Sequence, residues 1–112
     1  MRILITGAFG QLGFALNDVL SDKFDVIRTG RVIPSGLKGI RLNIQDKIYL
    51  NEVIAATSPD LIINLAAMTN VDACERNPEI AKEVNIAGFQ HICDSFKGKI
   101  IQLSTDYVFD GK

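Results

Sequence analysis

The sequence predicts an α/β domain built on a parallel sheet. Short apolar runs that suit strands alternate along the chain with longer segments that have helical spacing. The run over residues 61–65 is almost wholly apolar, which is typical of a parallel strand covered on both faces. We therefore expect a doubly wound sheet of five strands in the order 3-2-1-4-5, with right-handed crossovers and helices on both faces.

Composition sets the size and class of the protein. A chain of 112 residues with 47% hydrophobic and 22% charged residues suits one folded domain, here residues 1–112. Its 12 basic residues are balanced by 13 acidic ones without a basic cluster, which argues against a nucleic-acid or anionic membrane surface. The start of the chain lacks the apolar stretch of a signal peptide. Cys74 and Cys93 are isolated and suggest reduced thiols in a cytoplasmic protein, with a single disulfide as the alternative.

The most informative stretch is the junction between the first strand and the first helix. Residues 2–6 read Arg-Ile-Leu-Ile-Thr, an apolar core with β-branched residues, and Gly7, Gly10 and Gly13 follow with G-x-x-G-x-x-G spacing. In such a loop the first glycine allows the tight turn, the second lets a pyrophosphate approach the main chain, and the third lets the helix lie close to the sheet. The helix N-terminus then faces the phosphates. The pattern predicts dinucleotide binding, a tight turn without a ligand is the alternative, and the absence of a following Lys-Ser/Thr excludes a Walker A loop.

The second strand, expected over 24–29, leads to a turn that would meet the adenosine ribose. An acidic residue there would bind the 2′-hydroxyl of NAD, but this chain has Arg31, with Arg28 nearby. A guanidinium suits a 2′-phosphate, so we predict a preference for NADP(H), with NAD(H) as the other option. The alternative is that Arg31 is a solvated residue in a surface turn.

The remaining elements follow in order. The first helix is expected over 11–20, with Leu12, Ala15, Leu16, Val19 and Leu20 on its buried face. A short strand over 40–42 precedes a helix capped by Asn43 or Asp46, which ends at 58–60. The pattern then predicts a strand over 61–65, a helix over 79–96 and a last strand over 99–103. His91 lies alone in the helix expected over 79–96 and receives no role.

At this point three motifs resemble one family. The glycine loop at 7–13, the segment 64–72 (Asn-Leu-Ala-Ala-Met-Thr-Asn-Val-Asp) and above all 104–111 (Ser-Thr-Asp-Tyr-Val-Phe-Asp-Gly) look like dTDP-4-dehydrorhamnose reductase. The resemblance spans the whole chain and implies a Rossmann-type, extended short-chain dehydrogenase. Such enzymes reduce a dTDP-4-keto-6-deoxy sugar with NAD(P)H in the synthesis of dTDP-L-rhamnose. The glycine loop alone would fit any extended short-chain dehydrogenase.

The resemblance also implies roles for individual residues. Thr105 would be the catalytic hydroxyl, and Thr105 with Asp106 would contact the sugar nucleotide. Within the cofactor site, Gly10, Gln11 and Leu12 would meet the pyrophosphate, Arg31 the ribose, and Asn43 and Ile44 the adenine. The full set of implied cofactor residues comprises Gly7, Phe9, Gly10, Gln11, Leu12, Gly13, Arg31, Asn43, Ile44, Ala66, Ala67, Met68, Thr69 and Leu103. No metal ligand is expected.

Two departures from the family pattern bear on mechanism. The family often has Asp where this chain has Arg31 and Asn43, which leaves the choice of cofactor open. Family members supply the proton from a Tyr-x-x-x-Lys pair, whereas Tyr49 and Tyr107 are followed four residues later by Val53 and Gly111. We therefore expect this chain to be the cofactor-binding portion of a longer reductase and to be inactive alone. Its last strand would expose an edge that favours self-association.

Two other readings of the parent protein stay open. A non-catalytic NADP-binding regulatory subunit, similar to the beta subunit of methionine adenosyltransferase, would lack the Tyr-x-x-x-Lys pair by nature and would bind a protein partner. A sugar-nucleotide epimerase or dehydratase is the other, although the 104–111 motif disfavours it. The particular sugar nucleotide, a homodimer, and a metal that assists dimerisation are questions that the sequence leaves open.

Overall fold

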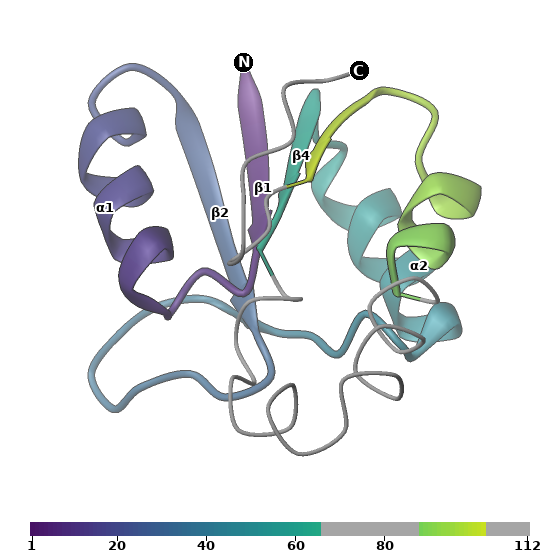
Figure 1. Ribbon diagram of the computed structural model, residues 1–112, viewed down its shortest axis with the longest axis horizontal. Coiled ribbons are helices and arrows are strands. Elements are labelled where there is room, and N and C mark those ends of the chain that lie inside the picture. Colours follow the sequence, from purple (N-terminus) through teal and green to yellow (C-terminus); the bar gives the residue numbers. More distant parts are fainter. Residues whose placement is uncertain (66–87, 103–112) are drawn as a thin grey trace.

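The protein is an α/β structure with one five-stranded parallel sheet (Figure 1). A computed structural model describes residues 1–65 and 88–102. The strands lie in the order β3-β2-β1-β4-β5, which confirms the predicted 3-2-1-4-5 order. Their bounds are β1 Arg2–Thr6, β2 Asp25–Gly30, β3 Ile40–Arg41, β4 Leu61–Asn64 and β5 Lys99–Gln102.

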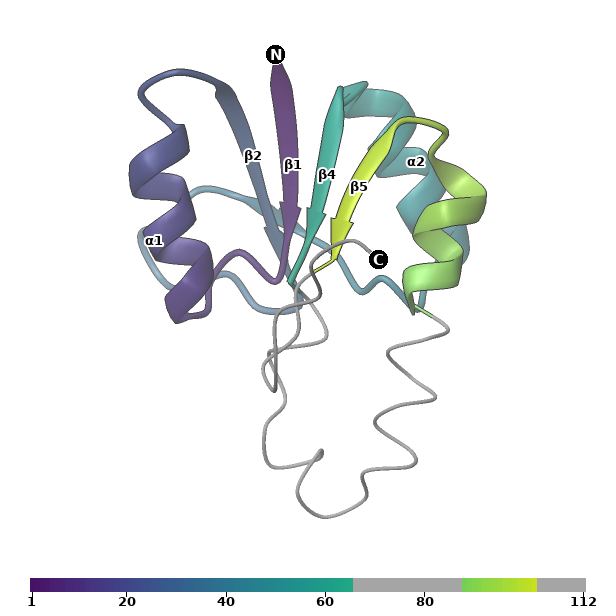
Figure 2. The same ribbon diagram turned by 45° about the horizontal axis from the view of Figure 1, so that its top comes forward.

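The register brings the carboxyl ends of the strands to one edge of the sheet. In β1, Ile3 pairs with Val26 of β2 on one side and with Leu61 of β4 on the other. Lys99 of β5 lies beside Leu61 in turn. Figure 2 shows β1, β2, β4 and β5 pointing the same way, so their ends converge. The chain leaves β1 toward β2 in one direction and reaches β4 in the other, which makes the end of β1 the switch point where open α/β sheets bind ligands.

Helices cover both faces of the sheet, as the sequence predicted (Figure 1). The helix α1, Gln11–Leu20, lies on one face, over the core cluster of Ile3, Ile5, Ala8, Ile63 and Leu65. The helix α2, Lys47–Thr57, and the helical residues 88–95 lie on the other. Their cluster comprises Leu4, Leu42, Ile44, Leu50, Val53, Ile54, Ile62 and Ile92. None of the helices in the described ranges is long and apolar enough to cross a membrane.

The bounds of α1 match the prediction, but its contact face differs. Val19 is 69% exposed and Leu12 is 37% exposed, and the buried residue of the helix is Gly13. Leu16 and Leu20 pack against the core beside it. The helix thus lies against the sheet along Gly13, Leu16 and Leu20. A glycine at the contact point lets the two backbones approach closely, and in this orientation Leu12 and Val19 face away from the sheet.

Local signals explain the limits of α2. The Asp46 carboxylate accepts a hydrogen bond from the Tyr49 backbone N–H at 3.2 Å, which selects Asp46 over Asn43 as the N-cap. Ser58 ends the helix in the left-handed conformation, with φ of 46°. Pro59 follows directly, so the chain cannot continue as a helix and turns into β4.

Candidate functional site

The candidate site lies at the carboxyl end of β1, where the chain turns through residues 7–10 into α1 (Figure 2). Gly7 adopts a φ of 63°, a left-handed conformation that side chains disfavour. The Ala8 N–H then donates to the Thr29 carbonyl of β2 at 2.9 Å. This bond holds the start of the loop against β2. The turn is therefore fixed by β1, from which it continues, and by β2, to which it is hydrogen-bonded.

Gly13 and Gly10 meet different surroundings. A Cβ atom on Gly13 would lie 2.2 Å from the Ala8 carbonyl oxygen, so the helix can sit this close only with glycine there. A Cβ atom on Gly10 would have the Gly7 carbonyl oxygen, 3.9 Å away, as its only described neighbour within 4 Å. Among the described residues, the backbone at Gly10 is therefore open to a ligand, and that at Gly13 is closed by packing.

The N-terminus of α1 offers hydrogen-bond donors beside this opening. Gly10 is the N-cap, and no side chain in the described residues caps the helix. The first intrahelical bond runs from Phe14 N–H to the Gly10 carbonyl, at 3.0 Å. The preceding N–H groups, including those of Gln11 and Leu12, thus have no intrahelical acceptor. The first turn also carries no acidic residue, so donors and helix dipole together favour an anion.

The Phe9 side chain does not lie in this opening. Its ring lies against Gly30 and Gly39, at the two ends of the connection between β2 and β3. Arg28 places its guanidinium carbon 5.4 Å from the ring centroid, and Phe14 meets the ring edge to face at 6.3 Å. The sequence analysis did not predict this cluster. The one signal for it in the sequence was the pair of glycines at 30 and 39, where the ring leaves no room for a side chain.

Arg31 and Asn43 stand at the β2 and β3 side of the site. Arg31 follows β2 directly and is exposed. Asn43 is exposed too, and its Oδ1 accepts a hydrogen bond from the Gln45 N–H at 3.0 Å. Ile44 is only 8% exposed, because its side chain packs in the core beside Gly88. The Ile44 carbonyl lies 3.0 Å from Nδ1 of His91, so the imidazole is a satisfied structural group when Nδ1 is protonated.

A buried polar network lies below the site and joins three strands. The Thr6 hydroxyl donates to Oδ1 of Asn64, and Nδ2 of Asn64 donates to Oε1 of Gln102 at 2.5 Å. The Thr6 hydroxyl also accepts from the Leu65 N–H at 3.1 Å. The sequence carried a signal for it, because β1, β4 and β5 are apolar runs that each end on a polar residue. These bonds fix the strand ends relative to one another.

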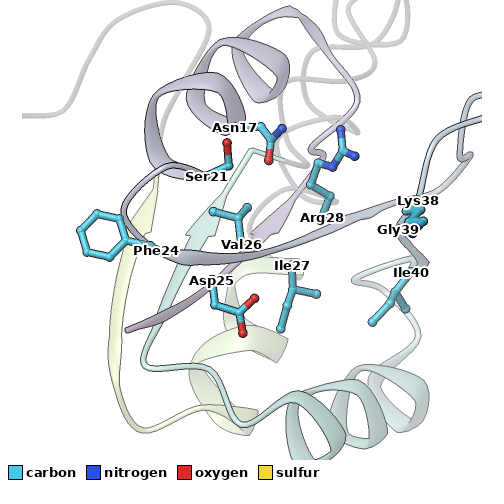
Figure 3. A pocket seen from close by; sticks show the side chains of 10 residues that line it. All are labelled: Asn17, Ser21, Phe24, Asp25, Val26, Ile27, Arg28, Lys38, Gly39 and Ile40. Carbon is cyan, nitrogen blue, oxygen red and sulfur yellow. The ribbon is translucent and has the colours of Figure 1, made fainter.

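A separate groove of about 590 Å³ runs along the outer edge of β2 (Figure 3). Val26 and Arg28 lie on its α1 side together with Asn17 and Ser21, whereas Asp25 and Ile27 lie on the opposite side of the strand. The groove is open because β3 pairs only with Thr29 and Gly30, which leaves the rest of the β2 edge unpaired in the described residues. It does not include the glycine loop.

Several predicted site residues fall outside the described ranges. These residues are Ala66, Ala67, Met68, Thr69, Leu103, Thr105 and Asp106. Of the remainder, the structure brings Gly7, Gly10, Gln11 and Leu12 together at the end of β1. Within residues 1–65 and 88–102, no group of three or more His, Cys, Asp or Glu side chains could hold a metal ion.

Comparison with known proteins identifies the family. The family model described as RmlD substrate binding domain matches residues 1–112. The dTDP-4-dehydrorhamnose reductase of Aggregatibacter actinomycetemcomitans is 39% identical, over 98% of this chain and 36% of its own length. That of Streptomyces griseus is 36% identical, over 98% of this chain and 35% of its own length. The chain thus spans about a third of the length of these curated relatives.

Solved structures agree with the fold. A hypothetical dTDP-4-dehydrorhamnose reductase from Sulfolobus tokodaii is 44% identical and has a TM-score of 0.76, covering 100% of this chain and 42% of that one. An L-threonine dehydrogenase from Phytophthora infestans has a TM-score of 0.80 at 23% identity, covering 94% of this chain and 36% of that one, and shows the shared fold alone. Since the family model matches every residue, the chain belongs to the RmlD substrate binding domain family.

Proposed function

We propose that this chain is the cofactor-binding portion of an NAD(P)H-dependent reductase that acts on a dTDP-4-keto-6-deoxy sugar in dTDP-L-rhamnose synthesis. The observation that carries the proposal is made on residues 1–65 and 88–102. There the backbone at Gly10 is open and the helix N-terminus beside it has no side-chain cap, at the switch point of the sheet. The relatives whose printed name is dTDP-4-dehydrorhamnose reductase support the substrate class.

The residues present fit a dinucleotide. The space above Gly10, which is open with respect to residues 1–65 and 88–102, would admit a pyrophosphate to the main chain. The N–H groups of Gln11 and Leu12 supply donors without a side-chain competitor in the same ranges. When bound, the reduced nicotinamide would supply a hydride to the sugar ketone. Asn43 and Ile44, which follow β3 after Leu42, would border the adenine.

NADPH is the proposed cofactor. Arg31 is exposed at the end of β2, where a 2′-phosphate would lie. The segment 26–45 contains Arg28, Arg31, Lys38 and Arg41 and not one Asp or Glu, in a chain whose net charge is −1. This concentration of positive charge favours the phosphorylated ribose over the free 2′-hydroxyl.

The roles on the substrate side rest on the family resemblance. Ala66, Ala67, Met68, Thr69 and Leu103 would border the ribose and nicotinamide, and Asp106 would contact the sugar nucleotide. The Thr105 hydroxyl would donate to the ketone oxygen, where negative charge develops during reduction. Removing a general acid costs about 10² to 10⁴ in rate, and the chain contains no Tyr-x-x-x-Lys pair, so we expect no measurable turnover from these 112 residues alone. The working form would be cytoplasmic.

Cofactor binding provides the first test. Titration of the chain with NADPH and with NADH, followed by nucleotide fluorescence, should show saturable binding with NADPH at least about 10-fold tighter, which is about 1.4 kcal/mol. Absence of binding at millimolar nucleotide contradicts the proposal, and tighter NADH binding contradicts the role of Arg31. Addition of a dTDP-4-keto-6-deoxy sugar should leave NADPH absorbance unchanged, and a rate comparable to that of a complete reductase would refute the expected inactivity.

A further inference from the structure

The Phe9 ring occupies space that side chains at two other positions would need. A Cβ atom on Gly30 would lie 2.9 Å from Cδ2 of Phe9, and one on Gly39 would lie 2.6 Å from Cζ. Neither glycine has a positive φ, so backbone conformation does not require glycine at these positions. At Gly30 the ring is the one described group that a Cβ atom would approach within 3.4 Å. At Gly39 the ring would be nearest, with the Arg28 carbonyl oxygen at 3.0 Å behind it, so the ring and the two glycines form one contact.

The ring is itself held from two further sides. The Arg28 guanidinium carbon lies 5.4 Å from its centroid, within the range of a cation–π interaction. Phe14 of α1 meets it edge to face, with an interplanar angle of 71°. A side chain fixed by two elements in this way has little freedom to move, so it can transmit the position of the glycine loop to whatever it touches.

What it touches are the two ends of the β2–β3 connection. Gly30 is the last residue of β2, and Gly39 immediately precedes β3. The residues between them include Arg31, and the exposed side chain of Val32 shows how little of this stretch packs in the core. β3 is two residues long and forms register pairs only with Thr29 and Gly30 in the described residues. A hydrogen bond from the Leu42 N–H to the Gly30 carbonyl, at 2.8 Å, holds the end of this segment. The Phe9 ring is a further attachment, and it contacts both ends of the connection.

We propose that Phe9 is a positioning residue that sets the place of Arg31 relative to the glycine loop. The inference rests on the proposed cofactor site and deepens it. The pyrophosphate would bind the main chain of the loop, and the 2′-phosphate would bind the connection, so the distance between the two subsites depends on the ring that joins them. Phe9 thus governs the discrimination between NADPH and NADH without its ring lying in the phosphate opening.

Three variants separate this role from general loss of stability. Phe9→Ala removes the ring. Phe24→Ala is the matched control, because Phe24 is also a half-buried phenylalanine packed on the same core cluster, but it lies at the amino end of β2. In Gly30→Ala, the Phe9 ring is the one described group that would lie closer than 3.4 Å to the added Cβ atom. This variant should therefore displace the ring without removing it.

Dissociation constants for NADPH and NADH should be measured for each variant. Phe9→Ala should raise the dissociation constant for NADPH at least about 10-fold and that for NADH less than about 3-fold. The preference for NADPH over NADH should therefore fall. Gly30→Ala should do the same, and the double variant should be no worse than either single one, since both remove one contact. Phe24→Ala should leave the ratio unchanged. Equal losses for both nucleotides, or additive losses in the double variant, would overturn the inference.

Amide hydrogen exchange of the unliganded chain supplies a second readout. Exchange in the peptide that covers residues 31–39 should rise at least about 10-fold in Phe9→Ala and stay at the wild-type rate in Phe24→Ala. Unchanged exchange in Phe9→Ala would show that the ring does not hold the connection. If the wild-type chain binds neither nucleotide but exchange responds as expected, the proposed function fails and the attachment by Phe9 stands.

Discussion

Gly10 and Gly13 are three residues apart at the same junction of loop and helix, yet they serve opposite purposes. At Gly10 the space for a side chain is open, with one described atom within 4 Å. At Gly13 that space is taken by the backbone of Ala8, whose carbonyl oxygen would lie 2.2 Å from a Cβ atom. Gly10 thus leaves room for a ligand, whereas Gly13 lets the helix pack directly against the backbone of Ala8. Substitution should therefore separate binding from folding.

The largest effect is expected from Gly13→Ala. A methyl group that meets the backbone of Ala8 cannot be accommodated by a rotamer change, so α1 must move off the sheet. The free energy of unfolding should fall by about 3 kcal/mol or more, although alanine is the better helix former by about 1 kcal/mol. Urea denaturation followed by circular dichroism measures it. Ala15→Gly on the exposed side of α1 is the control, because it measures the effect of helix propensity alone, about 1 kcal/mol. A Gly13→Ala variant as stable as wild type would contradict the packing role.

Gly10→Asn should weaken cofactor binding and leave stability intact, whereas Gly13→Ala should lower stability. Asparagine is a favoured N-cap, so stability should stay level or rise by a few tenths of a kcal/mol, about the difference between the two caps. Its side chain would occupy the open space and accept hydrogen bonds from the N–H groups proposed to bind the pyrophosphate. NADPH binding should weaken at least about 10-fold, measured by fluorescence titration. Gly10→Ala, which adds bulk without an acceptor, should show a smaller loss, and unchanged affinity in both variants would place the cofactor elsewhere.

The sequence predicted the frame of the fold because that frame depends on local pattern. The order of strands, the bounds of α1 and the turn at Gly7 all follow from apolar runs, glycine spacing and the handedness of crossovers. Each of these signals lies within a few neighbouring residues. For the same reason the family resemblance, carried by short motifs, was confirmed by the comparisons.

What the sequence could not show are contacts between residues far apart in the chain. The contact of the Phe9 ring with Gly39 and the hydrogen bond from Asn64 to Gln102 depend on how the elements are placed in space. Leu12 and Val19 illustrate the same limit, because helical periodicity marks an apolar stripe but not which edge of that stripe meets the sheet. Periodicity also cannot foresee that a glycine is the contact point.

The smallest effect, and the one that calibrates the other two, is expected from Gly36→Ala. Gly36 has a φ of 83°, and a Cβ atom there would meet no described atom within 4 Å, so only backbone strain opposes a side chain. Stability should fall by about 1 kcal/mol, the usual cost of placing a non-glycine residue in a left-handed conformation. Gly36→Asn should recover part of it, because asparagine tolerates this region better. If Gly36→Ala costs as much as Gly13→Ala in urea denaturation, the loss at Gly13 no longer reports contact with Ala8, and the contrast with Gly10 would need another cause.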